Sequence, residues 1–246
     1  MVLPAEQYLR VYPNGYFSEL AQLELDAGLA ALGEKPIQIA PAQGNPFTQG
    51  TVRADVDFRV GDSYSYRQLD RDTKEERRRF TNTVVRITDT EVIFDRKLVL
   101  DRLGNLVGHP DGRRFTPRQD QPLEYAIGKK WKTRFSVVNR HGARFNTEIE
   151  FRITRRENVT VPAGAFGCFV IEGAGYSANE HGVWFAIAST RWMAPDRVRS
   201  PVISENYLKV SARIGGPHFG KGGKGWEVGD VLDNERAELV EYKQTR

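Results

Sequence analysis

The side chains best suited to nucleophilic or acid–base chemistry are few in this sequence and lie far apart. The single cysteine, Cys168, lies in an apolar, strand-like run, where a thiol usually behaves as a small hydrophobic side chain. A reactive thiol instead needs an accessible, electropositive setting and a histidine beside it. His141 and His181 each precede a glycine in an expected turn, where histidines are usually exposed. The sequence therefore predicts a buried Cys168 and no enzyme activity in this chain.

Metal-binding patterns are missing from the sequence at the spacings that metals require. The four histidines, His109, His141, His181 and His218, include no pair two or four residues apart. A single cysteine allows neither an intramolecular disulfide nor a cysteine-based zinc cluster. Residues 95–105 lack the glutamate and the carboxylate spacing of a calcium loop. We therefore expect no metal and no cofactor.

The glycine-rich stretch at residues 215–225 has part of the spacing of a phosphate-binding loop. Gly215, Gly220 and Lys221 fit that pattern, but Gly222 replaces the hydroxyl residue that would hold magnesium. No helical pattern follows, although such a loop opens a helix. We interpret the stretch as a flexible loop, with weak anion binding by Lys221 and Lys224 as the alternative.

Two carboxylates, Glu148 and Glu150, lie on the same side of one expected strand, about 7 Å apart. Carboxylates at such a distance can act as a pair in glycoside hydrolysis. Their strand face also carries Arg144 and Arg152, however, and is opposite the apolar face. An ion-paired, solvated face is the preferred interpretation.

Aromatic residues on the expected strands form the most informative set. In one interpretation they fill the hydrophobic core. In the other, a curved sheet leaves a cavity and they line a pocket for an apolar ligand. The candidate ligand-binding residues are Tyr64, Tyr66, Trp131, Phe135, Phe151, Trp184, Phe185 and Trp192.

Composition excludes several classes of protein. Hydrophobic residues make up 39% and charged residues 28%, as in ordinary globular domains. No stretch approaches the roughly 18 consecutive apolar residues of a transmembrane helix. The net charge is +4, and the basic residues lie in short clusters rather than in one stripe with aromatic residues, so nucleic-acid binding is not expected. The first residues do not resemble a signal peptide and begin almost inside a helix, so we expect a piece of a longer protein.

The residues before position 50 must provide a connection rather than the core. Residues 5–12 have a helical pattern that ends at a Pro-Asn-Gly turn, and Phe17, Leu20, Leu25 and Leu29 continue with helical spacing up to Gly33. The sequence predicts an αα-hairpin at residues 1–35. A linker rich in Pro, Gln, Gly and Asn follows at residues 36–50, and a β domain at residues 51–246.

Beyond residue 50 the apolar residues alternate with polar ones. In residues 145–153, for example, Phe145, Ile149 and Phe151 alternate with Asn146 and Glu150. Such a period of two is typical of antiparallel strands with one buried face. The clearest strands are expected at residues 52–60, 131–137 and 145–153. Weaker patterns predict strands at residues 63–69, 83–88, 91–95, 97–101, 168–176, 183–193, 205–214 and 236–243.

These patterns predict a mainly β protein. No helical pattern follows residue 50, and parallel strands need crossover connections, so the sheet should be antiparallel. We expect a curved antiparallel sheet, a β-clam, half-barrel or open barrel, with the αα-hairpin before it. A closed barrel or a sandwich is the alternative.

Two segments resemble known bacterial sequences. Tyr8-Leu9, Tyr12-Pro13-Asn14-Gly15, Phe17 and Leu20-Ala21 resemble a helical motif found after the catalytic domain of caspase-like peptidases and in other multidomain proteins. Val161-Pro162-Ala163-Gly164-Ala165-Phe166 and Trp192-Met193-Ala194-Pro195 resemble the pattern of bacterial envelope domains of unknown function. Residues 128–131 and 238–242 belong to that second pattern, and the insertion at residues 215–230 departs from it.

The two resemblances imply the C-terminal accessory region of a bacterial caspase-family protein, in the periplasm or cell envelope. Any protease would then lie outside this chain. We hypothesise a non-catalytic accessory or protein-interaction module that contacts a neighbouring domain or a protein partner. A carrier or sensor of a hydrophobic ligand, held in the concave face of the sheet, is the competing hypothesis. An unrecognised hydrolase is the third.

Overall fold

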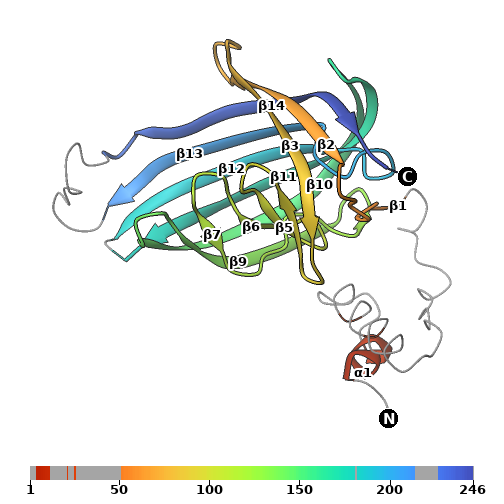
Figure 1. The fold of residues 1–246 in the computed structure, drawn as a ribbon. Helices are drawn as coiled ribbons and strands as arrows, with labels where there is room; N and C mark the ends of the chain where they lie inside the picture. The colour runs from red at the N-terminus through yellow and green to blue at the C-terminus, as the bar shows by residue number, and fades with distance from the viewer. Residues whose placement is uncertain are drawn as a thin grey trace. The chain divides into compact units, whose positions relative to one another are not determined.

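The computed structural model describes residues 4–11, 21, 25, 51–180, 182–213 and 227–245 (Figure 1). The chain divides into two compact units, Met1–Thr51 and Val52–Arg246. In the first unit, helix α1 (Pro4–Val11) buries Ala5 and Leu9, which are four residues apart and so share one helix face. Most of the predicted second helix and all of the predicted linker lie outside the described residues. The αα-hairpin therefore stays a prediction.

Strands make up nearly all the regular structure that is described in the second unit. Twelve of them close into one antiparallel barrel, in the order β10-β11-β12-β13-β14-β2-β3-β4-β5-β6-β7-β9, and β1 pairs separately with β8. Figure 1 shows the long strands β9 to β14 as a curved wall, with β3 and the short strands crossing in front. The strands are β1 (Val52–Arg53), β2 (Ser63–Asp70), β3 (Glu76–Ile87), β4 (Glu91–Phe94), β5 (Val99–Asp101), β6 (Leu106–Gly108), β7 (Arg114–Phe115), β8 (Glu124–Tyr125), β9 (Lys130–Val138), β10 (Arg144–Val161), β11 (Gly164–Asn179), β12 (Val183–Met193), β13 (Ile203–Arg213) and β14 (Val231–Lys243).

The alternating sequence of β9 and β10 sets which side chains point into the barrel. Trp131 and Phe135 of β9 and Ile149 and Phe151 of β10 are buried in one cluster. Their neighbours along each strand are mostly polar, and successive strand residues of a barrel point alternately in and out. The intervening positions, such as Glu148, therefore form the outer wall.

Strand β11 departs from this alternation because both of its faces are buried near its start. Phe169 and Ile171 belong to the cluster inside β9 and β10, whereas Cys168 and Val170 belong to a larger cluster on the other face. A continuous apolar run is what a strand covered on both sides requires. Farther along β11, Gly175 passes so close to β10 that a Cβ atom there would lie 2.0 Å from the backbone oxygen of Glu148.

The connection between β12 and β13 packs into the larger hydrophobic cluster. Val198 and Val202 of this connection are fully buried in the larger cluster, with Tyr66 and Leu239. Arg199 ties the connection to two other segments, because its guanidinium lies 2.7 Å from a carboxylate oxygen of Asp62 and 2.8 Å from one of Asp55. The buried pair with Asp62 and the partly exposed pair with Asp55 hold the connection to both segments.

The barrel closes between β7 and β9, where only two residue pairs join the strands. The connection from β7 to β8 supports this seam. Arg118 forms an ion pair with Asp120, and its guanidinium lies 3.9 Å from the ring centre of Phe135. Asp120 also accepts a hydrogen bond from the backbone of Leu106, at 3.1 Å. These contacts stabilise a seam at which β7 and β9 share only two residue pairs.

The mainly β, antiparallel prediction is confirmed, but two details of it are corrected. The sheet closes on itself, so the closed barrel, the alternative from the sequence, replaces the β-clam. Residues 52–60 form a strand only at Val52–Arg53. Beyond it, Ala54 donates to the Leu123 carbonyl and Asp55 to the Pro195 carbonyl, so these backbone groups bond to separate connections and no regular ladder forms.

No helix in the described part of the chain is both long enough and apolar enough to cross a membrane.

Candidate functional site

Seven of the eight aromatic candidates from the sequence are packed into the core. Each of the seven is at most 9% exposed. They contact other core residues closely: Trp131 stacks on Phe151 with ring centres 5.3 Å apart, and Tyr66 stacks on Phe80 at 5.5 Å. They fall into three clusters: Tyr64, Tyr66 and Trp192 in the largest, Trp131, Phe135 and Phe151 in the second, and Phe185 in the third.

The polar atoms of these buried aromatic residues are bonded within the fold. The Tyr66 hydroxyl donates to the backbone oxygen of Pro201 at 2.7 Å, and burial raises its pKa. The indole nitrogens of Trp131 and Trp192 donate to the Gln119 carbonyl, at 3.1 Å, and to a Glu157 carboxylate oxygen, at 2.5 Å. These bonds give the side chains a structural role.

Trp184 is the exception among the eight candidates, because it lies on the outer wall. Its ring contacts that of Tyr176, with centres 5.1 Å apart and planes inclined by 36°. Tyr176 is 41% exposed and was not singled out from the sequence. The signal was nevertheless present, since a large aromatic residue at an outward-facing position of an alternating strand is unusual.

The register of the sheet places this pair beside a row of polar residues. Across β9, β10, β11 and β12, one row runs Arg134, Glu148, Tyr176, Ala186, and the next runs Ser136, Asn146, Ala178, Trp184. Tyr176 and Trp184 are therefore diagonal neighbours, each opposite an alanine. Because those alanines are small, the rings stand clear of the strand surface and meet each other.

An open hollow of about 390 Å³ lies in these rows, and we call it the outer-wall hollow. Glu148 at its edge forms ion pairs with Lys132 and Arg134, whose hydrogen bonds lower the pKa of the Glu148 carboxyl. The Ser136 hydroxyl donates to the Asn146 side-chain oxygen at 2.8 Å. The hollow is lined by Thr116, Arg134, Phe135, Ser136, Asn146, Thr147, Glu148 and Tyr176.

Glu148 is one of the two carboxylates, with Glu150, that the sequence analysis considered as a pair. The ion-pair partners of Glu148 come from the neighbouring strand β9, not from Arg144 and Arg152 of its own strand. A carboxylate held between two cations stays charged, which suits salt-bridge formation better than proton donation.

A second hollow, of about 560 Å³, lies over β2 and β14 beside a ladder of ion pairs. Arg236 bridges Glu205 and Glu238 at 2.6 and 2.7 Å, and Arg67 contacts Glu238 at 2.7 Å. Arg71 adds a contact of 3.2 Å to Glu205. Opposite charges on neighbouring strands stabilise a sheet, so this ladder is explained by the fold.

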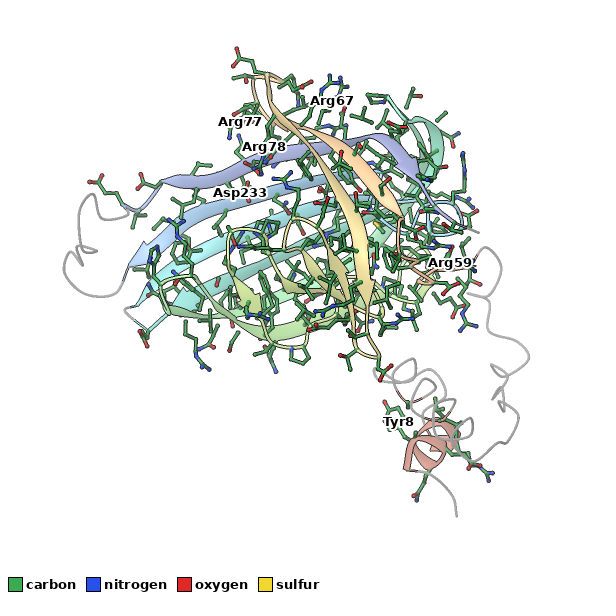
Figure 2. All side chains as sticks on the ribbon, in the orientation of Figure 1. Tyr8, Arg59, Arg67, Arg77, Arg78 and Asp233 are labelled. Atoms are coloured by element: carbon green, nitrogen blue, oxygen red, sulfur yellow. The ribbon has the colours of Figure 1, made fainter. Side chains whose placement is uncertain are left out.

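A third group of charges involves residues of β3 and β14, and Figure 2 labels Arg77, Arg78 and Asp233. Arg77 lies 3.9 Å from Glu235 and forms an ion pair with Asp70. The Oδ1 atom of Asp233 is buried without a hydrogen-bond partner among the described residues. Burial and the nearby Glu235 raise the pKa of Asp233 to about 6, although the charges of Arg113 and Arg77 act in the opposite direction.

The remaining chemical candidates gather into no site within the described ranges. Cys168 is fully buried, as predicted, and burial raises the pKa of its thiol to about 12. His109 pairs with Asp111 at 2.9 Å, and burial lowers its pKa. The described residues contain no group of three metal-binding side chains. The predicted anion-binding residues Lys221 and Lys224, together with His181 and His218, lie outside them.

The chain resembles two solved structures at low sequence identity. No family model and no curated protein matches the chain. Among solved structures, a Bacteroides fragilis protein described as exported, with a YmcC-like fold, is 12% identical, with a TM-score of 0.45. A Parabacteroides distasonis protein described as a lipoprotein is 11% identical, with a TM-score of 0.43. Each match covers 78% of this chain and 100% of the other. At these low TM-scores, the two similarities assign neither a family nor a function to this chain.

Proposed function

We propose that this chain is a non-catalytic accessory module of a larger bacterial protein, and that it binds a partner molecule at the outer-wall hollow. The observation that carries the proposal is the position of Tyr176. This large aromatic residue is 41% exposed, stands beside an open hollow, and contacts a second aromatic residue, Trp184. Exposed aromatic side chains next to a depression are typical of recognition surfaces.

The burial of Cys168 and the ion pairs of Glu148 support a role in binding rather than in catalysis. The Cys168 thiol is buried, and its raised pKa keeps it protonated at neutral pH. Glu148, the carboxylate nearest the hollow, is held by Lys132 and Arg134. A general acid or base would need a pKa near the working pH, whereas these cations lower the pKa of Glu148.

The test measures binding by the full chain on arrays of bacterial saccharides and of peptides. We expect at least one class of molecule to be retained by the wild-type protein, to be released unchanged by mass spectrometry, and to be lost in Tyr176→Ala. Val85→Ala, which shortens an exposed apolar side chain of β3, is the matched control and should bind like the wild type. Retention that does not depend on Tyr176, or the release of cleaved molecules, would refute the proposal.

A further inference from the structure

The Tyr176 ring at the outer-wall hollow suits a flat ligand with an apolar face. Tyr176 lines the hollow, whereas Trp184 of the adjacent strand is outside the lining and packs against the Tyr176 ring, with ring centres 5.1 Å apart. This contact supports the Tyr176 ring from one side. An aromatic face is electron-rich and attracts the weakly positive C–H groups of a ring that lies on it.

Polar groups beside Tyr176 in the hollow offer hydrogen bonds in more than one direction. Asn146 lies in the row next to Tyr176, and its side-chain oxygen accepts from Ser136 at 2.8 Å. No acceptor in the described ranges bonds to its amide nitrogen, which is left as a donor. Thr116 accepts from the backbone nitrogen of Ser136 at 2.8 Å, so its own hydroxyl hydrogen is available to a ligand.

The charge of the hollow argues against a phosphate or another strongly charged ligand. Its lining contains one cation, Arg134, and one anion, Glu148, and the two form an ion pair. A site for phosphates usually presents several cations to the ligand. A lining with no net charge, but with both donors and acceptors, instead fits a neutral molecule that carries several hydroxyl groups.

The size of the hollow also fits a small ring compound. Its volume of about 390 Å³ falls within the roughly 300–1,000 Å³ of small-molecule sites. Because the hollow is open along the outer wall, a chain of rings can extend beyond it in either direction without meeting the barrel interior.

We propose that the outer-wall hollow binds a neutral saccharide, with one sugar ring stacked on Tyr176. Hydroxyls of that ring accept from Asn146 and Thr116 and bond to the Arg134–Glu148 pair. This inference rests on the proposed function and gives the ligand of that same surface its chemical class. A sugar ring combines an apolar C–H face with a rim of hydroxyls, and the Tyr176 ring and the polar residues beside it can bind both.

The experiment titrates the full chain with neutral oligosaccharides of glucose, mannose and N-acetylglucosamine, followed by calorimetry and by NMR. We expect one of these series to bind. Tyr176→Ala should weaken that binding about tenfold, the effect of losing one stacking contact. Asn146→Ala keeps both rings and should weaken binding by several fold, whereas Tyr176→Phe should stay within about twofold of the wild type.

The outcomes separate this inference from the proposed function. If no neutral saccharide binds but peptides are retained in a Tyr176-dependent way, the saccharide inference is wrong and the proposed function stands. If neither class is retained, both are wrong. Circular dichroism of each variant checks folding. Should Tyr176→Ala fail to fold, Asn146→Ala decides, and saccharide binding unchanged in that variant would overturn the inference.

Discussion

Two arginine–carboxylate groups, one largely buried at the β12–β13 connection and one on the outer wall of the barrel, use the same chemistry in different settings. The Arg199 side chain is 4% exposed and contacts Asp62, which is fully buried, and Asp55. The Arg134 side chain is 74% exposed and shares Glu148 with Lys132. In the first group Arg199 and Asp62 are shielded from water, so each of these charges depends on its partner, whereas the Asp55 side chain is 38% exposed. In the second, water can replace either partner.

This difference in exposure distinguishes residues that stabilise the fold from residues that can change their contacts when a ligand binds. Breaking a buried pair leaves an uncompensated charge in an apolar setting, whereas an exposed pair contributes little to stability. The outer wall around Tyr176 can therefore change its contacts when a ligand arrives, without a large cost in folding free energy.

The largest effect is expected from Arg199→Ala. It leaves the Asp62 carboxylate buried without its cation and removes the contact that ties the connection between β12 and β13 to Asp62. We expect the free energy of unfolding to fall by about 3–5 kcal/mol. Urea unfolding followed by circular dichroism measures this change. The matched variant Arg134→Ala should lose no more than about 0.5 kcal/mol, and equal losses in the two variants would remove the distinction between the groups.

The second effect concerns the close approach of β11 to β10. In Gly175→Ala, the new Cβ atom would lie 2.0 Å from the Glu148 backbone oxygen, so one of the strands must move. We expect a loss of about 2–3 kcal/mol, typical of overpacking. Ala174→Ser changes the neighbouring, exposed position of the same strand and should stay within about 0.5 kcal/mol. A stable Gly175→Ala variant would mean that the wall is more pliable than the structure implies.

Asp233 should make stability depend on pH. Its pKa is raised from 3.8 to about 6, so the folded chain binds more protons than the unfolded chain between these values. The free energy of unfolding should therefore fall as pH rises from about 4 to 6, and should keep that loss above pH 6. A shift of this size corresponds to about 3 kcal/mol, which partial exposure reduces to about 1–2 kcal/mol.

Asp233→Asn tests this dependence by removing the charge while keeping the shape. We expect the variant to be more stable than the wild type by about 1–2 kcal/mol at pH 7.5 and nearly equal to it at pH 4. Asp89→Asn, at an exposed turn, is the control and should leave the pH profile unchanged. A parallel pair of profiles for Asp233→Asn and the wild type would refute the assignment.

The sequence predicted the strands better than their closure or the candidate site. The sequence located β9 and β12 almost to the residue. β9 shows a clear alternation of apolar and polar residues, whereas β12 shows a weaker pattern that begins with an apolar run. Alternation missed β6 and β7, whose two or three residues are too short to show a period, and these strands complete the barrel. The sequence analysis also selected eight aromatic residues by residue type alone, and seven of them are buried in the hydrophobic core. Tyr176 and Trp184 become neighbours only through the pairing of β11 with β12, which a single sequence does not specify.

The smallest effect on stability is expected at the site itself, from Tyr176→Ala. The side chain is exposed, and its main contact is the neighbouring Trp184, so the free energy of unfolding should change by no more than about 0.5 kcal/mol. Urea unfolding followed by circular dichroism measures the free energy of unfolding of Tyr176→Ala and of the wild type. A loss above about 1 kcal/mol would indicate that Tyr176 packs as part of the wall, and weaker ligand binding in that variant could then reflect damage to the fold. Unchanged stability together with lost binding would instead assign the side chain to recognition, because nothing in the folded state would depend on it.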